Sequence, residues 1–223
     1  ALTWLSCYDN QLTTLDVSNN TALTYLQCGD NLLTSLDVSS NTALTELGCP
    51  ENQLTSLDVS ANTALSHLYC NDNELTSLDV SANTALTSLS CHDNQLTSLD
   101  VSSNTALSSF ECTSNQITAL DVSNNTELSW FKCGDNQLTS LDVSSNPNLT
   151  FLVCSHNQLT YLNMKNGLTD QLTNFYATGN SSLTCIETLD PDYATENWTN
   201  IDEGVTFDVI CGAEARTHWY VDT

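Results

Sequence analysis

Apolar and polar positions follow one pattern that recurs every 21 residues along most of the chain. Each unit reads LxxLxCxxNxLxxLDVSxNxx, and eight such units lie between Leu2 and Met164. In both halves of a unit, apolar residues alternate with polar ones, which is typical of short strands that face a core on one side. A repeat of this length predicts stacked coils rather than a single compact core.

Two columns of identical residues mark the repeat. Cysteine recurs at Cys7, Cys28, Cys49, Cys70, Cys91, Cys112, Cys133 and Cys154, and asparagine recurs at Asn10, Asn31, Asn52, Asn73, Asn94, Asn115, Asn136 and Asn157. One coil cannot bury its leucines alone, so neighbouring coils are expected to cover one another. Buried polar groups need partners, and the asparagines are therefore expected to bond the backbone of adjacent coils. Helix is not expected, because Ser, Thr, Asn and Asp compete with helical hydrogen bonds.

The unit resembles a leucine-rich repeat, whose signature is LxxLxLxxN followed by a spaced leucine. It is similar to the short bacterial class called IRREKO, with cysteine in the third apolar position and LDV in the second half. The resemblance implies a leucine-rich repeat solenoid that is rich in β-structure and has little helix. A parallel β-sheet would line its concave side, and short extended segments would line the opposite side. Residues 1–164 would form the eight repeats, residues 165–212 a C-terminal cap, and residues 213–223 a tail or linker.

The ten cysteines fall into two groups. The eight in the repeats are expected to be buried and to act as small apolar residues. A metal site is not expected among them, because the chain contains no CxxC pair. Cys185 and Cys211 lie outside the repeats, and we expect a disulfide between them that closes the cap. Trp198 and Phe207 are expected to cover the last coil beside it. The segment from residue 180 to 211 resembles the end of many secreted leucine-rich repeat proteins of Bacteroidetes-type bacteria, which implies a secreted or cell-surface protein.

Variation between units is confined to positions that flank the inward leucine and cysteine. Residues 54–68 and 75–89 agree in 13 of 15 letters, and one difference places His67 where the next unit has Ser88. Exposed aromatic residues on a rigid surface are typical recognition anchors, whereas ring packing between neighbouring strands is the structural alternative. The candidate ligand-binding residues in these columns are Trp4, Tyr8, Tyr25, Glu46, His67, Tyr69, His92, Glu111, Trp130, Lys132 and Phe151.

The charge of the chain excludes several classes of partner. The formal net charge is -24, and the basic residues are only Lys132, Lys165 and Arg216. Nucleic acids and anionic membranes both require basic groups, so neither is expected as a partner. No stretch has the apolar length of a membrane span, and no signal peptide is recognised. The start at Ala1 within a repeat suggests a processed or truncated chain.

Acidic residues form two further columns. One consists of Asp16, Asp37, Asp58, Asp79, Asp100, Asp121 and Asp142, and the other consists of Asp9, Asp30, Glu51, Asp72, Asp93 and Asp135, with Ser114 interrupting it. Stacked carboxylates repel, and hydrogen bonds from nearby hydroxyls or backbone amides are expected to offset this. Calcium bound at Asp16, Asp37, Asp58, Asp79 and Asp100 is the alternative, although the chain has no DxDxDG-type loop. No other cofactor or metal is expected.

These features together predict an extracellular binding module rather than an enzyme. His67 and Glu46 lie in neighbouring units, but an open sheet gives an acid–base pair little protection from water. The variable face is expected to bind a protein or a glycan, and the sequence does not choose between them. The alternative is a structural or adhesive cell-surface spacer without a specific ligand.

Overall fold

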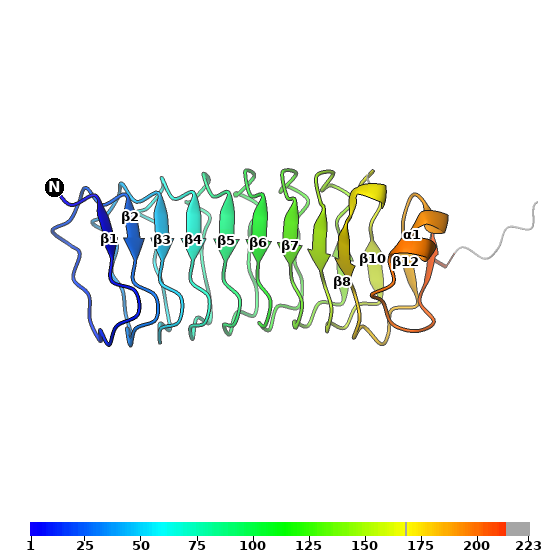
Figure 1. Cartoon of the computed structure of the whole chain (residues 1–223), viewed down its shortest axis with the longest axis horizontal. Helices are drawn as coiled ribbons and strands as arrows, with labels where there is room; N and C mark the ends of the chain where they lie inside the picture. Colours follow the sequence, from blue (N-terminus) through cyan, green and yellow to red (C-terminus); the bar gives the residue numbers. More distant parts are fainter. Residues whose placement is uncertain (168, 213–223) are drawn as a thin grey trace, which may run out of the picture.

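The coils stack in one row along the long axis of the molecule (Figure 1). In the computed structural model of the protein, the described residues are 1–167 and 169–212, so the predicted tail at residues 213–223 lies outside them. Parallel strands dominate, and the described part of the chain contains one α-helix and one short 3-10 helix. The predicted β-rich solenoid with little helix is confirmed.

One side of the row is a parallel sheet to which each coil contributes three residues. In spatial order its nine described strands are β1 (Trp4–Ser6), β2 (Tyr25–Gln27), β3 (Glu46–Gly48), β4 (His67–Tyr69), β5 (Ser88–Ser90), β6 (Ser109–Glu111), β7 (Trp130–Lys132), β9 (Phe151–Val153) and β11 (Asn174–Tyr176). The central residue of each strand pairs with its equivalent in the next coil, as Leu26 does with Leu47. These central side chains are buried from β2 onward, while the two flanking residues face outward. This sheet is the predicted concave side.

The LDV half of each coil forms the opposite side of the solenoid. Regular strands occur there only toward the C-terminal end of the described chain, as β8 (Ser140–Asp142), β10 (Tyr161–Asn163), β12 (Cys185–Glu187) and β13 (Thr206–Asp208). Earlier LDV segments are not paired as strands, but they bury the same side chains, for example Leu57 and Val59. Burial of alternate apolar residues is therefore common to the coils that follow the first.

The parallel stacking continues beyond Met164, into the segment that the sequence assigns to the cap. Strand β11 pairs with β9, and its central residue Phe175 takes the place of the inward leucine. Ala177 takes the place of the cysteine and is also buried, but it lies 23 residues after Cys154 rather than 21. The longer interval contains the 3-10 helix η1 (Thr169–Gln171).

A short helix and an aromatic cluster cover the C-terminal end. Helix α1 (Pro191–Asn197) begins after Asp190, whose side chain accepts a hydrogen bond from the backbone N–H of Tyr193. Proline at the first helical position suits this start, because its ring sets the helical φ. Trp198 is 4% exposed, and its ring lies 4.9 Å from that of Phe175 and 5.8 Å from that of Phe207. The expected covering role of Trp198 and Phe207 is confirmed.

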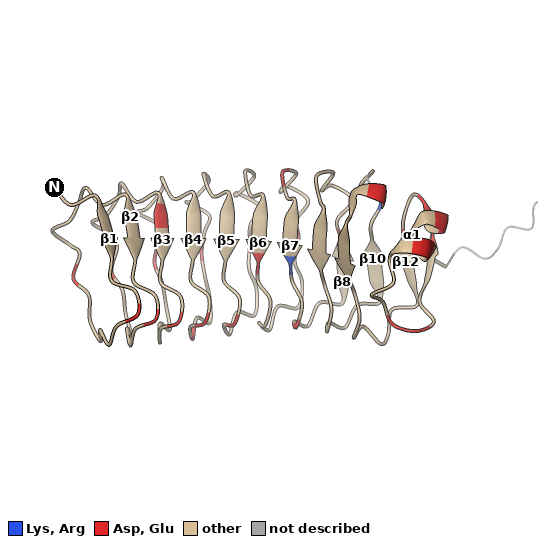
Figure 2. Ribbon diagram, viewed as in Figure 1, with Lys and Arg blue, Asp and Glu red and all other residues tan. Residues whose placement is uncertain are grey.

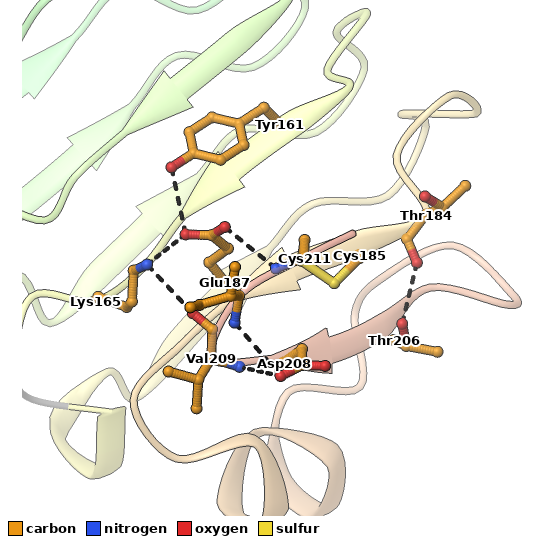
Figure 3. The surroundings of a disulfide bond; sticks show 10 residues. Tyr161, Lys165, Thr184, Cys185, Glu187, Thr206, Asp208, Val209 and Cys211 are labelled. Atoms are coloured by element: carbon orange, nitrogen blue, oxygen red, sulfur yellow. Dashed lines mark hydrogen bonds and ion pairs between the residues drawn. A yellow bond between two sulfur atoms is a disulfide. The ribbon is translucent and has the colours of Figure 1, made fainter. Parts of the chain in front are cut away.

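The predicted disulfide between Cys185 and Cys211 is present (Figure 3). Beside it, Glu187 accepts hydrogen bonds from the backbone N–H of Cys211 and from Nζ of Lys165. Lys165 in turn reaches the carbonyl oxygen of Val209 at 3.2 Å. The cystine and this ion pair both hold the last described residues against β10 and β12.

The eight repeat cysteines line the core as free thiols. From Cys28 onward they are fully buried, whereas Cys7 in the first coil is partly exposed. Burial raises the pKa of Cys28 and of Cys154 to about 12. A thiol with such a pKa is almost never a thiolate at neutral pH, so these cysteines act as apolar side chains.

The predicted asparagine column joins each coil to its neighbours. Nδ2 of Asn94 lies 3.0–3.2 Å from the carbonyl oxygens of Cys70, Cys91 and His92, and its Oδ1 accepts the backbone N–H of Leu75 at 2.9 Å. One side chain therefore satisfies polar groups of two coils inside the core. The same contacts recur at Asn31, Asn52, Asn73, Asn115, Asn136 and Asn157.

A second buried asparagine column follows the LDV segments and is less completely bonded. Nδ2 of Asn104 donates to the carbonyl oxygens of Val80 and Asn83 at 3.0 and 2.9 Å. Its Oδ1 has no hydrogen-bond partner among the described residues, and the same is true of Asn41, Asn62, Asn83, Asn125 and Asn146. The two columns therefore contribute unequally to the stability of the stack.

We expect Asn94→Ala to lower the free energy of unfolding by about 3 kcal/mol, because it leaves the backbone N–H of Leu75 unpaired in the core and removes one of the donors to three carbonyl oxygens. Asn104→Ala, which removes fewer bonds, is expected to cost about 2 kcal/mol. The control is Asn124→Ala at an exposed position, with a cost below about 0.5 kcal/mol. Urea unfolding followed by circular dichroism measures all three. Equal costs for Asn94 and Asn124 would contradict the assigned role.

The disulfide closes a loop with a sequence separation of 26 residues. Replacing Cys185 and Cys211 by Ser together is expected to destabilise the C-terminal coils by about 3 kcal/mol, since the open loop gains entropy when unfolded. Hydrogen exchange should then rise in β12 and β13 while β3 to β5 keep their protection. Uniform loss of protection along the whole chain would show that the cap is not a separate cooperative unit.

Candidate functional site

Nine of the eleven predicted binding residues lie on the outer face of the nine-stranded sheet. Trp4 is 57% exposed at the edge of the sheet, but the residues in the interior strands are half-buried. Adjacent parallel strands are about 4.8 Å apart, so each side chain is covered on both sides by its equivalents in the neighbouring coils. The face is therefore a close-packed surface, and it presents the outer parts of its side chains rather than whole rings.

The first two coils form an aromatic patch at the N-terminal end. The rings of Trp4 and Tyr25 are stacked with centroids 5.1 Å apart and an interplanar angle of 11°. Their strands pair in register at these two residues. Each ring covers one face of the other. The rings therefore pack across neighbouring strands and at the same time form part of the surface, so the two interpretations of the aromatic column do not exclude each other here.

A larger cluster lies toward the C-terminal end of the same face. The rings of Trp130 and Phe151 stack with centroids 5.5 Å apart, and Tyr176 lies 6.4 Å beyond Phe151 in a tilted arrangement. Nζ of Lys132 lies 4.4 Å from the centre of the Trp130 ring and 3.2 Å from Oε1 of Glu111. This is a cation–π contact combined with an ion pair. The structure thus brings four of the predicted residues together.

Tyr176 belongs to this cluster but was not among the predicted residues. The sequence places it in the cap, because the 21-residue interval fails after Cys154. The signal that identifies it is the spacing of Phe175, Ala177 and Asn180, which repeats the LxCxxN pattern with different apolar residues. Asn180 makes the contacts of the asparagine column, including a bond from Nδ2 to the carbonyl oxygen of Cys154.

The middle of the face carries polar groups around one aromatic ring. The rings of His67 and Tyr69 lie 6.3 Å apart, and Nδ1 of His67 is 2.8 Å from Oγ of Ser66. Glu46 pairs with His67 in strand register, but its Oε1 accepts a hydrogen bond from Nε2 of Gln27. Each group thus has its own partner, which fits a polar binding surface better than an acid–base pair.

The second acidic column occupies the turn that follows each strand. Figure 2 shows acidic residues recurring along one edge of the row of coils. Every residue at this position has a positive φ of 50–57°. This holds also for Ser114, which replaces the acid in the sixth coil, and for His156 in the eighth coil. Asp, Asn and His adopt this left-handed conformation more readily than most residues do. The composition of the column therefore reflects a turn requirement that the sequence analysis did not identify.

Two predicted residues lie beside this row of turns. Tyr8 is 48% exposed in the first coil. Nδ1 of His92 lies 2.7 Å from Oδ2 of Asp93 and 3.8 Å from Oδ2 of Asp72 in the preceding coil. His92 is therefore separate from His67 and Tyr69 and joins two acidic turns.

The first acidic column lies on the opposite side of the solenoid. Oδ1 of Asp58 accepts a hydrogen bond from the backbone N–H of Ser60 at 2.9 Å, and the same bond recurs from Asp16 to Asp142. Hydrogen bonds from the Ser60 hydroxyl and backbone hold the pKa of Asp58 below its usual value, against a smaller opposing effect of Asp37 and Asp79. The expected hydroxyl and amide bonds are thus confirmed. Calcium binding at this column stays a prediction.

Several solved structures with the same architecture come from bacteria. The functional domain of InlJ from Listeria monocytogenes, described as including a cysteine ladder, is 42% identical with a TM-score of 0.76; the match covers 84% of this chain and 45% of that one. The chain is a leucine-rich repeat protein. An internalin, inlF, from Listeria monocytogenes is 22% identical with a TM-score of 0.67, and the match covers 86% of this chain and 57% of that one. The leucine-rich repeat protein LIC12759 from Leptospira interrogans is 20% identical with a TM-score of 0.60, over 92% of this chain and 59% of that one.

The last two similarities show the leucine-rich repeat fold alone, and the chain spans less than half of the length of the InlJ structure. No protein-family model matches the sequence, and neither does any curated protein. The similarity to Bacteroidetes proteins and the IRREKO repeat type stay predictions. Among the residues that the structure describes, no helix has the length and apolar character needed to cross a membrane.

The depressed pKa of Asp58 makes its stabilising effect depend on pH. Because the folded value lies below the usual 3.8, the effect is present above that pH and is lost as pH falls through the folded value. We expect Ser60→Ala to be less stable than the wild type at about pH 6, with the difference shrinking below about pH 3. Thermal melts across this range measure it, with the exposed Ser103→Ala as control. A deficit that stays constant with pH would contradict the hydrogen-bond assignment.

Proposed function

We propose that the chain is a non-catalytic binding module that recognises a protein ligand through the outer face of the nine-stranded sheet. The observation that carries this proposal is the confinement of sequence variation to that face. Inward positions and the opposite side repeat almost unchanged, whereas residues such as His67, Lys132 and Tyr69 occur once each in their columns. Core packing does not require such variation, because these side chains point away from the core.

The geometry of the aromatic residues supports a protein rather than a glycan ligand. Sugars are usually held against the open face of an aromatic ring. In the pair Trp4–Tyr25 and in the pair Trp130–Phe151, the ring faces are turned toward each other. The edges of these stacked rings suit apolar and edge-to-face contacts with protein side chains. The adjacent Glu111–Lys132 pair adds one negatively and one positively charged group beside an apolar surface, as is common in protein interfaces.

Two features support action outside the cell. The disulfide of Cys185 with Cys211 needs an oxidising compartment to persist. The Listeria neighbours include internalins, and one is described as a functional domain. We therefore propose a secreted or cell-surface protein. A spacer without a ligand would need the same stiff stack but not the single occurrence of His67, Lys132 and Tyr69.

Replacing Trp130 and Tyr69 by Ser removes one ring from the C-terminal aromatic cluster and one from the middle of the face. Serine occupies the equivalent places in β5, as Ser88 and Ser90, so the coil tolerates it. We expect the double variant to bind a protein ligand about 30-fold more weakly, as when central interface residues are lost. The ligand is to be found on an array of extracellular protein domains, with a glycan array screened in parallel, and affinities measured by surface plasmon resonance.

The matched control is Thr55→Ala with Asp58→Asn on the opposite side, which should leave the affinity unchanged. Specific binding to glycans without any protein hit would reject a protein ligand. An unchanged affinity in the Trp130 and Tyr69 variant would reject the assigned face. A chain that binds neither array would support the spacer.

A further inference from the structure

We propose that Asp72, His92 and Asp93 form a binding site for a divalent transition-metal ion such as Zn²⁺. Oδ2 of both carboxylates and Nδ1 of the imidazole lie close together between the fourth and fifth coils, where Oδ2 of Asp72 also accepts a hydrogen bond from Nδ2 of Asn71. One ligand atom from each residue lies within 4.8 Å of the other two. This site is distinct from the proposed protein-binding rings, and the inference does not depend on that function.

The repeat itself produces the convergence. Asp72 and Asp93 are equivalent residues of adjacent coils, so their carboxylates project from neighbouring turns along the same edge of the sheet. His92 immediately precedes the second of them, and its Nδ1 lies 2.7 Å from Asp93 and 3.8 Å from Asp72. Among the eight repeats this position holds His once; the other residues are Tyr8, Gly29, Pro50, Asn71, Thr113, Gly134 and Ser155. A pair of stacked acids recurs along the column, but the nitrogen ligand is specific to this place.

The backbone that carries the three ligands is held on both sides. The N–H of Asp72 donates to the carbonyl oxygen of His92, and the N–H of Asp93 donates to that of Thr113, both at 3.0 Å. The carbonyl oxygen of His92 also accepts a hydrogen bond from Nδ2 of the buried Asn94. The side chain of His92 is 24% exposed, so only part of the imidazole must lose water when an ion binds. Little ordering of the backbone is therefore needed on binding, which favours affinity.

The donor set selects the class of metal. Calcium and magnesium prefer oxygen ligands alone, whereas an imidazole nitrogen with carboxylates suits zinc, nickel and related ions. Three protein ligands also leave coordination positions for water or for a group of another molecule. The strongly negative chain attracts cations to the site. Thiols do not compete from the repeats, because Cys70 and Cys91 are buried with strongly raised pKa values.

Titration of the full chain with ZnCl₂, followed by calorimetry and by NMR of the histidine rings, tests the site. We expect one saturable site per chain, with the signals of the His92 ring shifting and binding reversed by EDTA. His92→Thr, which introduces the residue of the next coil, should weaken binding at least roughly tenfold, and Asp93→Asn should do the same. His67→Ser is the matched control, since it removes an imidazole from the same sheet and should leave zinc affinity unchanged.

Three results would overturn the proposal. The first is the absence of saturable zinc binding, which would mean that His92 only pairs with the two carboxylates. The second is an unchanged affinity in His92→Thr when its circular dichroism spectrum matches that of the wild type. The third is an equal response of the His92 ring to CaCl₂, which would indicate a general effect of cation screening rather than coordination by nitrogen.

Discussion

The fold depends on hydrogen bonding that the coils cannot satisfy alone. Each turn of the solenoid buries backbone carbonyls that face the core, and such buried groups need a hydrogen-bond partner. The asparagine of the next coil reaches back to them, as Asn94 does to the carbonyl oxygen of Cys70. This contact works only if successive coils lie in register. Hydrogen bonding between coils therefore fixes how successive coils align, including where the interval lengthens before Asn180, and the leucine core fills the space between them.

A constant interval has consequences for the surface. Equivalent residues of successive coils stand one strand spacing apart, so each outward column is a row of side chains in contact. Aromatic neighbours stack, as Trp4 does on Tyr25, and opposite charges pair, as Lys132 does with Glu111. Like charges are also forced together, and the Asp58 column tolerates this because each carboxylate accepts hydrogen bonds from its own serine. One geometric rule thus explains the stacked rings, the ion pair and the bonded acids.

Much of this could be predicted from the sequence, because the repeat shows each environment many times. Periodicity predicts the inward cysteines, the bonded asparagines and the outward variable columns. Cys185 and Cys211 could be identified as a pair because they lie outside the repeating series of cysteines. Prediction failed where a local backbone conformation determines the residue, or where the repeat pattern changes. Asp72 and Asp93 were treated as charges, but their place in the chain is a left-handed turn. Tyr176 was missed because Phe175 and Ala177 replace leucine and cysteine and the interval lengthens. Helix α1 depends on contacts with the cap that have no repeat to reveal them.

The same rigidity also bears on how such a surface acquires specificity. A strand of three residues, bonded on both sides, cannot adjust its backbone to a ligand, so recognition must come from which side chains stand at the outward positions. Exchange of one side chain, such as Tyr69 against Ser90, leaves the core contacts of its coil unchanged, since Leu68 and Leu89 are buried alike. The outward positions can therefore change independently of stability. The left-handed turns behave similarly: Ser114 and His156 adopt the same φ as the acids, and the side chain there is free to serve a purpose other than folding.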